Sequence, residues 1–201
     1  LYLAFEALEK GRIQQSQKLM VSRQAARMPA SKLGLRRGRT ITLEHAILAL
    51  VTKSANDAAV VIAEALAGSE TKFARLMTKK AQALGMSRTS FRNASGLPNR
   101  RQLSTARDMA RLAQALIRDF PRYYIYFSTK TFRYNGRTYR NHNELLKTYK
   151  GTDGVKTGYT RASGYNLAAS TIRHGRRLIA VVFGGKSARS RDRHIARLLD
   201  K

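Results

Sequence analysis

The sequence predicts an α/β (α+β) fold: an antiparallel sheet flanked by helices, with a helical subdomain beside it. Apolar residues recur at helical spacing in the first part of the chain, whereas two hairpin signals mark the second part. An amphipathic segment then closes the chain. Hydrophobic residues make up 43% of the 201 residues and charged residues 25%, which fits one packed domain and not a disordered chain.

The first part of the chain is expected to be mainly helical. A helix over 1–10 stops at Gly11, and the polar, basic residues 12–40 read as an extended loop region. Thr42 is the expected N-cap of the next helix, because a threonine side chain accepts a bond from the first helical turn. That helix carries an apolar stripe of Leu43, Ala46, Ile47, Leu50 and Val51. Further helices are expected over 57–66, 69–84 and 105–117.

The sheet is expected in the second part of the chain. Asn135-Gly136 lies between two β-rich segments, a strong signal for a tight hairpin. A second hairpin turns at His174-Gly175, and the other expected elements are a strand over 155–160 and a closing helix over 188–199. We therefore divide the chain into a helical subdomain at about 12–125 and a sheet with closing helix at about 126–201.

The charge balance is unusual, since 39 Lys and Arg face 12 Asp and Glu, a net charge of +27. Such a chain attracts polyanions, and an anionic membrane or cell-wall surface is one candidate partner. A nucleic-acid-binding module is the alternative from another class, but no DNA-reading or base-stacking motif accompanies the charge, so nucleic acid is not the expected partner. The chain has no cysteine, which excludes disulfides and thiolate chemistry. We expect neither a metal nor a cofactor.

Two short motifs point to chemistry. Ser54-Ala55-Asn56 lies between two apolar helices, and Lys156-Thr157-Gly158 lies on an expected strand. Each has an ordinary structural alternative: Ser54 and Asn56 are good helix caps, and Lys156 can be an exposed strand lysine. Either motif alone is common, whereas the two in this order match the Ser-x-Asn and Lys-Thr-Gly pair of serine acyl-transfer enzymes.

The phrases around these motifs carry a more specific resemblance. They are Ser54-Ala55-Asn56-Asp57-Ala58-Ala59, Asn93-Ala94-Ser95-Gly96-Leu97-Pro98, Asn141-His142-Asn143-Glu144-Leu145-Leu146 and Asp153-Gly154-Val155-Lys156-Thr157-Gly158-Tyr159-Thr160. Almost from end to end the chain resembles the D-alanyl-D-alanine carboxypeptidases, low-molecular-mass penicillin-binding proteins of serine peptidase family S11. The resemblance implies a β-lactamase/transpeptidase-like fold and a periplasmic or otherwise extracytoplasmic location.

The resemblance also implies an activity: removal of the terminal D-alanine from peptidoglycan pentapeptides through an acyl-enzyme, with β-lactam antibiotics as inhibitors. Ser54 and Lys156 would relay protons, and Asn56 would orient substrate amide groups. Thr157 and Lys156 would face the substrate carboxylate, and Gly158 would let substrate backbone lie along the strand.

Two further residues are assigned by the resemblance alone. Arg191 stands where these enzymes keep an arginine that helps hold the terminal carboxylate, although Arg189 could be confused with it. Tyr159 follows Lys-Thr-Gly where some members have histidine, and it joins the expected substrate-binding residues.

The nucleophile of this family lies in a Ser-x-x-Lys motif upstream of the phrase that matches Leu1-Tyr2-Leu3. We therefore expect an N-terminally truncated catalytic domain that lacks this motif and its first strands, exposes an apolar sheet edge and forms no acyl-enzyme alone. Ser69-Glu70-Thr71-Lys72 has the right letters, but it follows the Ser-x-Asn motif and reads as an ordinary helix cap.

Three other functions stay open from the sequence. A β-lactamase would share the motifs but needs a glutamate to activate water, and none is convincingly placed. A DD-endopeptidase, which acts on cross-links, is more similar to the carboxypeptidases, and the sequence separates these two activities only weakly. A non-catalytic polyanion- or wall-binding relative is the third.

Overall fold

The computed structural model describes residues 1–200, and their elements follow the order expected from the sequence. The helices are α1 (Tyr2–Glu9), α2 (Arg23–Ala26), α3 (Leu43–Lys53), α4 (Asn56–Ala67), α5 (Glu70–Ala83), α6 (Ala106–Asp119), α7 (Pro121–Tyr124), η1 (Ile125–Ser128), α8 (Leu145–Thr148) and α9 (Ala188–Leu199). The strands are β1 (Lys18–Met20), β2 (Thr40–Thr42), β3 (Thr131–Tyr134), β4 (Arg137–Arg140), β5 (Thr152–Thr160), β6 (Gly164–Arg173) and β7 (Arg176–Gly185). No helix within residues 1–200 is long and apolar enough to cross a membrane.

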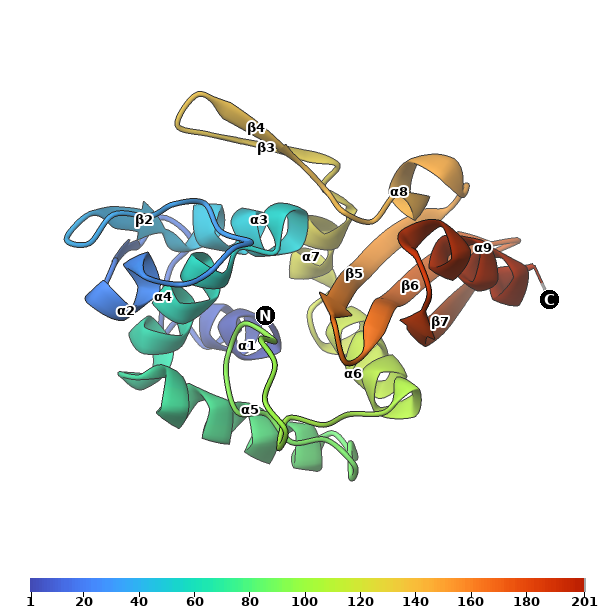
Figure 1. The fold of residues 1–201 in the computed structure, drawn as a ribbon, viewed down its shortest axis with the longest axis horizontal. Coiled ribbons are helices and arrows are strands. Elements are labelled where there is room, and N and C mark those ends of the chain that lie inside the picture. The colour runs from blue at the N-terminus through green and yellow to red at the C-terminus, as the bar shows by residue number, and fades with distance from the viewer. Residues whose placement is uncertain (201) are drawn as a thin grey trace.

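The main sheet is an antiparallel meander in the order β5-β6-β7. Helix α9 covers one face of it, where Leu167, Ala169, Ala180 and Val182 pack with Ile195 and Leu199. Helices α6 and η1 lie against the other face, which carries the alternate residues of the same strands. Successive side chains of each strand point to opposite faces of the sheet, so the strands contribute to the packing on both faces. Figure 1 shows the sheet between its helices.

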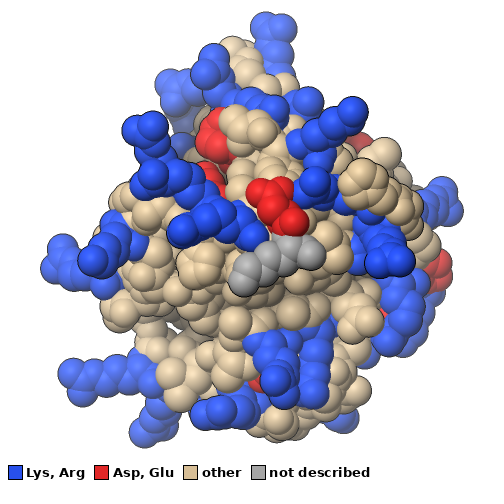
Figure 2. All heavy atoms as spheres, turned by 90° about the vertical axis from the view of Figure 1, so that its right-hand side faces the viewer, with Lys and Arg blue, Asp and Glu red and all other residues tan. Residues whose placement is uncertain are grey.

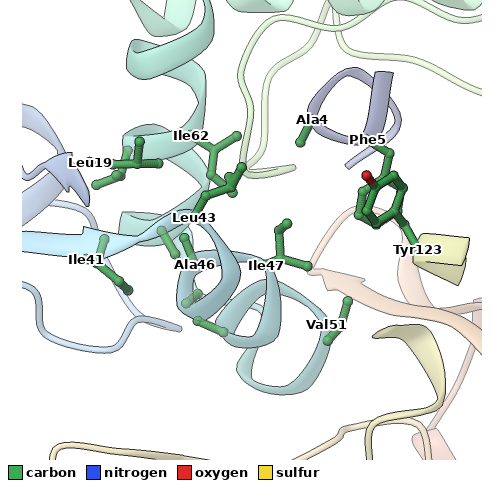
Figure 3. Packing of buried hydrophobic residues seen from close by; sticks show 14 of the residues in the cluster. Ala4, Phe5, Leu19, Ile41, Leu43, Ala46, Ile47, Val51, Ile62 and Tyr123 are labelled. Carbon is green, nitrogen blue, oxygen red and sulfur yellow. The ribbon is translucent and has the colours of Figure 1, made fainter. Parts of the chain in front are cut away.

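The helical part packs around α3 and α4. Leu43, Ala46 and Ile47 of α3 meet Ile62 of α4, while Phe5 of α1 stacks on Tyr123 with ring centroids 5.4 Å apart (Figure 3). This cluster extends to Val155 and Ala168 of the sheet, so one continuous core joins the two parts of the chain. The junction between α3 and α4 is therefore fixed on both sides by buried side chains.

The prediction of an extended loop over 12–40 is wrong in part. Strands β1 and β2 pair antiparallel, with Leu19 opposite Ile41, and the short helix α2 is capped by Ser22, whose side chain accepts from Ala25 N at 3.0 Å. Each element is only three or four residues long. Elements this short are stabilised by pairing and capping and not by a periodic pattern, so periodicity did not indicate them.

The two hairpins have the geometry that their turns predict. Asn135 and Gly136 have φ of 46° and 75°, and His174 and Gly175 have φ of 47° and 73°, as a tight two-residue turn needs. The β3–β4 hairpin stands out from the body above α3 (Figure 1). Strand β7 lies at the edge of the main sheet within the described residues, and Leu178 and Phe183 are exposed on it.

Candidate active site

Ser54 sits at the sharp junction between α3 and α4. It ends α3 in the left-handed conformation, with φ of 55° and ψ of 44°. The N-cap position of α4 is occupied by Ala55, which makes no side-chain cap. The helix-capping alternative for Ser54 and Asn56 is therefore wrong, and the Ser54 hydroxyl is available for another partner.

A neighbouring loop, residues 29–35, is bonded to this junction at several points. Asn56 donates its side-chain Nδ2 to Pro29 O at 3.1 Å and its backbone N–H to Ser31 O at 2.8 Å. Ser31 Oγ donates in turn to Lys53 O at 2.8 Å. Within residues 1–200 no hydrogen bond uses Asn56 Oδ1, so this oxygen remains able to accept from a ligand amide.

Asp57 is the anchor of that loop, a role that was not predicted from the sequence. Its side chain is fully buried, and its carboxylate accepts from the backbone N–H groups of Leu33, Gly34 and Leu35 at 2.9–3.0 Å. A buried carboxylate is stable only when its acceptor capacity is used in this way. The sequence did contain a signal for this role, because an aspartate directly follows the Ser-x-Asn motif. It lies in the first turn of an almost wholly apolar helix.

Lys156 reaches the Ser54 junction from the main sheet. It lies on β5 opposite Ala168 of β6, and its Nζ donates to Ser54 Oγ. The same Nζ lies 3.1 Å from Thr157 O and 3.4 Å from Thr157 Oγ1. The two motifs, 102 residues apart in the chain, thus meet in one place.

The environment of Lys156 destabilises its ammonium form. Burial of the ammonium group, and then the like charge of Arg191, lowers the pKa of Lys156 to about 8. An amine with this pKa exchanges protons near neutral pH, which an exposed strand lysine does not. The alternative interpretation of Lys156 as an ordinary exposed strand lysine does not fit this environment.

Arg191, and not Arg189, is the arginine near the lysine. Its side chain is 4% exposed, whereas Arg189 is exposed. Its guanidinium donates to Asp192 Oδ1 at 2.7 and 2.9 Å and to Asn166 O on β6 at 3.3 Å. Helix α9 therefore supplies a fixed positive charge beside Lys156.

The remaining predicted residues continue along β5. Gly158 is exposed, and a Cβ there would lie 3.8 Å from the nearest side-chain atom, so packing inside the chain does not require glycine. Tyr159 is 60% exposed and its ring lies 4.5 Å from that of Tyr165. The structure brings Ser54, Lys156 and Thr157 into contact, while Gly158 and Tyr159 follow on the open part of the strand; their roles toward a substrate stay predictions.

Ser69 is an ordinary helix cap. Its hydroxyl accepts from Lys72 N at 3.2 Å, and Glu70 beside it binds Gln24 and the backbone of Ala94. Within residues 1–200 no group of three or more His, Asp or Glu gathers in a way that could hold a metal. At the Ser54 junction, the contact between Lys156 and Ser54 allows proton transfer, and the positive charges of Lys156 and Arg191 allow recognition of an anion.

The chain is similar to a known protein family and to curated members of it. The family model described as D-alanyl-D-alanine carboxypeptidase, peptidase S11, matches residues 1–187. The chain is similar to D-alanyl-D-alanine carboxypeptidase DacF of Bacillus subtilis, at 37% identity over 100% of this chain and 52% of the relative.

Two solved structures show the same likeness. Penicillin-binding protein 5 of Haemophilus influenzae is 33% identical with a TM-score of 0.95, over 99% of this chain and 59% of the other. Penicillin-binding protein D2 of Listeria monocytogenes in its ampicillin-bound form is 31% identical with a TM-score of 0.87, over 98% of this chain and 82% of the other. The chain spans about half the length of the curated relatives it matches.

Proposed function

The chain belongs to peptidase family S11, the D-alanyl-D-alanine carboxypeptidases, and from that membership we propose that it forms part of a serine-type carboxypeptidase. The proposed reaction removes the terminal D-alanine from peptidoglycan stem peptides through an acyl-enzyme. One observation carries the proposal: Lys156 of the Lys-Thr-Gly strand donates to Ser54 of the Ser-x-Asn junction. Such a pair can pass a proton to and from the reacting groups.

In this mechanism a serine hydroxyl attacks the carbonyl before the terminal D-alanine and its proton passes to the Lys156–Ser54 pair. The bond to the D-alanine nitrogen then breaks, and that nitrogen leaves with a proton from the same pair. Ser54 hands over that proton, and Lys156 replenishes it, because its pKa of about 8 lets it both take and give protons near neutral pH. Water then cleaves the acyl ester and regenerates the serine. Asn56 would accept from a substrate amide through its unused Oδ1.

The substrate carboxylate would lie near Lys156, Thr157 and Arg191, where positive charge gathers. Gly158 presents exposed backbone on β5, along which an extended peptide can lie as an added strand. Tyr159, at 60% exposure, would contact the same peptide. Recognition of a D-alanine carboxylate by these groups is the part of the proposal that separates it from simple wall binding.

We assign the attacking serine to none of the 201 residues. The Ser-x-x-Lys sequence at Ser69 belongs to a helix cap, and Ser54 has no lysine one turn after it. The 201 residues are proposed to be a partial catalytic domain, with a helical subdomain at about 12–125 and a sheet part at about 126–201. Penicillin and other β-lactams would bind at the same Ser54–Lys156 site.

The experiment uses a peptide that ends in D-Ala-D-Ala. In the protein as isolated from its source cells, we expect release of D-alanine and stable labelling by penicillin, both reduced at least about a hundredfold by Lys156→Gln. Lys150→Gln, which removes an exposed lysine, is the matched control. The isolated 201-residue chain should bind the peptide reversibly and take up no label; stable labelling of Ser54 or Ser69 in that chain contradicts the proposed roles.

The comparisons do not favour the alternatives of the same fold. The Bacillus subtilis relative carries a carboxypeptidase name, and the two solved structures carry penicillin-binding names. Rapid turnover of penicillin, or cleavage of cross-linked peptides in preference to D-Ala-D-Ala ends, would reverse this choice.

The charge suggests where the enzyme works. The face in Figure 2 carries Lys and Arg side chains around its outline and few acidic ones. We propose that the protein acts outside the cytoplasm, at an anionic wall or membrane surface to which a chain of net charge +27 is attracted.

A further inference from the structure

Strand β5 contains one residue more than its pairing with β6 requires, shortly before Lys156. Thr152 and Gly154 pair with consecutive residues of β6, so Asp153 between them is the extra residue of a β-bulge. An extra residue in one strand shifts by one the faces to which the following side chains point. The bulge therefore decides which face of the sheet Lys156 occupies.

Asp153 and Lys156 both contact the helical part of the chain. Lys156 Nζ donates to Ser54 Oγ, and Tyr124 Oη of α7 donates to Asp153 Oδ1 at 3.4 Å. Residues three apart in a regular strand point to opposite faces, so the bulge is what allows both contacts. Gly154, the next residue of the bulge, also lies against Tyr124, since a Cβ there would be 2.5 Å from Tyr124 Oη. The bulge thus packs closely against α7.

The Asp153 carboxylate is held by an arginine from two strands away. Arg177 of β7 reaches across β6, and its Nη1 donates to the two oxygens of Asp153 at 2.9 and 2.7 Å and lies 2.7 Å from Ser170 Oγ. Its guanidinium also lies 5.5 Å from the centre of the Tyr124 ring. The side chains of Arg177 and Asp153 are 29% and 26% exposed, so water and salt screen this pair less than a fully exposed one. The ion pair ties the extra residue of β5 to the strand at the opposite edge of the sheet.

A buried amide holds the bulge at a second point. Asn143, in the segment after β4, donates its Nδ2 to Gly154 O at 3.2 Å. Its own backbone N–H donates to Asn141 Oδ1 at 2.9 Å, which fixes its position. The backbone of the bulge is therefore bound by Asn143 and its side chain by Arg177, two residues before Lys156.

We propose that Asp153 and Arg177 are a positioning pair for the proposed reaction: they fix the β5 bulge and so direct Lys156 toward Ser54. This inference rests on the proposed function and adds to it two residues that act on the reaction through Lys156. When the pair is broken, the bulge is free to move along β5, and a shift of one residue turns Lys156 to the other face of the sheet. Fewer molecules then have Lys156 on Ser54, while Arg191 on α9 keeps its place.

The test uses the protein isolated from its source cells, with Asp153→Asn, Arg177→Gln and the two together. Each single substitution should lower kcat for D-alanine release about tenfold and change KM less than about threefold, because the lysine is misplaced while Arg191 still faces the carboxylate. The double variant should also lose about tenfold, and not about a hundredfold, because the two residues act as one unit. Arg177→Lys keeps a charge facing Asp153 and should retain most of the activity. Arg176→Gln removes the adjacent exposed arginine and should leave kcat unchanged.

Labelling by penicillin separates positioning from loss of the fold. The labelled fraction at completion counts the folded molecules, whereas the rate of labelling depends on proton transfer between Lys156 and Ser54. We expect Asp153→Asn and Arg177→Gln to label slowly but to reach the level of the unmodified protein. An unchanged rate in the folded molecules, or a double variant that loses the product of the two single effects, overturns the positioning role and leaves the proposed function standing. Failure of the unmodified protein to release D-alanine overturns both.

Discussion

Among single residues near the site, Asp57 makes the contacts that hold the neighbouring loop in place. One carboxylate fixes three backbone N–H groups of the 29–35 loop, and that loop in turn binds Asn56 and Lys53 on either side of Ser54. Asp57 thus acts through its neighbours as a positioning residue. It does not touch Lys156 or any group proposed to react.

Asp57→Asn should lower the free energy of unfolding by about 3 kcal/mol, because it replaces one buried acceptor oxygen with an NH2 donor that faces backbone N–H groups, which then lack a partner. Urea denaturation measures the loss. Glu64→Gln is the matched control, since Glu64 accepts a single bond, from Ser22 Oγ at 2.9 Å. We expect that control to cost less than about 1 kcal/mol. A loss for Asp57→Asn no larger than that of the control would show that the loop is held by other contacts.

The pKa of Lys156 offers a second prediction at this scale. Arg191 holds that pKa down by like-charge repulsion, added to the larger effect of burial. Arg191→Gln removes the repulsion, so the pKa of Lys156 should rise above about 8 without reaching its ordinary value. Carbon-13 NMR of labelled lysine side chains measures it.

Arg189→Gln serves as the comparison, because Arg189 is exposed and two residues away in sequence. It should leave the pKa of Lys156 unchanged. A pKa that responds equally to both substitutions would mean that general surface charge, and not Arg191, acts on the lysine.

Among the elements, α5 tests the interpretation of the second Ser-x-x-Lys sequence. Ser69→Ala removes the N-cap that accepts from Lys72 N at 3.2 Å, and should lower the free energy of unfolding by about 1 kcal/mol. D-alanine release by the protein from its source cells should not change. Thr71→Ala, at an exposed first-turn position without a capping role, is the control. Loss of activity in a folded Ser69→Ala protein would restore Ser69 as a candidate nucleophile.

The elements that the sequence predicted well are those with a strong local signal. Thr42 and Ser69 each cap the helix expected of them, and both hairpins turn at the expected pairs. Strands β1 and β2 were missed because their stability depends on each other across the 12–40 segment. Helix α7 and η1 were missed because their aromatic residues are buried by tertiary packing, which no periodic pattern announces.

On the scale of the whole molecule, the candidate site depends on a long-range contact. The spacing of 102 residues between Ser54 and Lys156 carries no information about their meeting, so only the resemblance to a family predicted it. The role of Asp57 could not be predicted from its residue type, because it depends on which loop folds against its carboxylate. Residue types indicated the chemistry, and tertiary structure decides which atoms can perform it.

The charge of +27 leads to the last prediction, which concerns the whole surface. Because cations are spread over the molecule, binding to inorganic polyphosphate should weaken about a hundredfold between 50 and 200 mM salt, as counterion release requires.

Two variants each remove three exposed charges, on opposite sides of the body in Figure 1. They are Lys72→Gln/Arg75→Gln/Lys79→Gln on α5 and Arg133→Gln/Arg137→Gln/Arg140→Gln on the β3–β4 hairpin. Diffuse attraction predicts that both variants weaken binding by a similar factor at one salt concentration, measured by fluorescence anisotropy. Loss of binding in only one of them would show instead that the polyanion occupies a local site on that element.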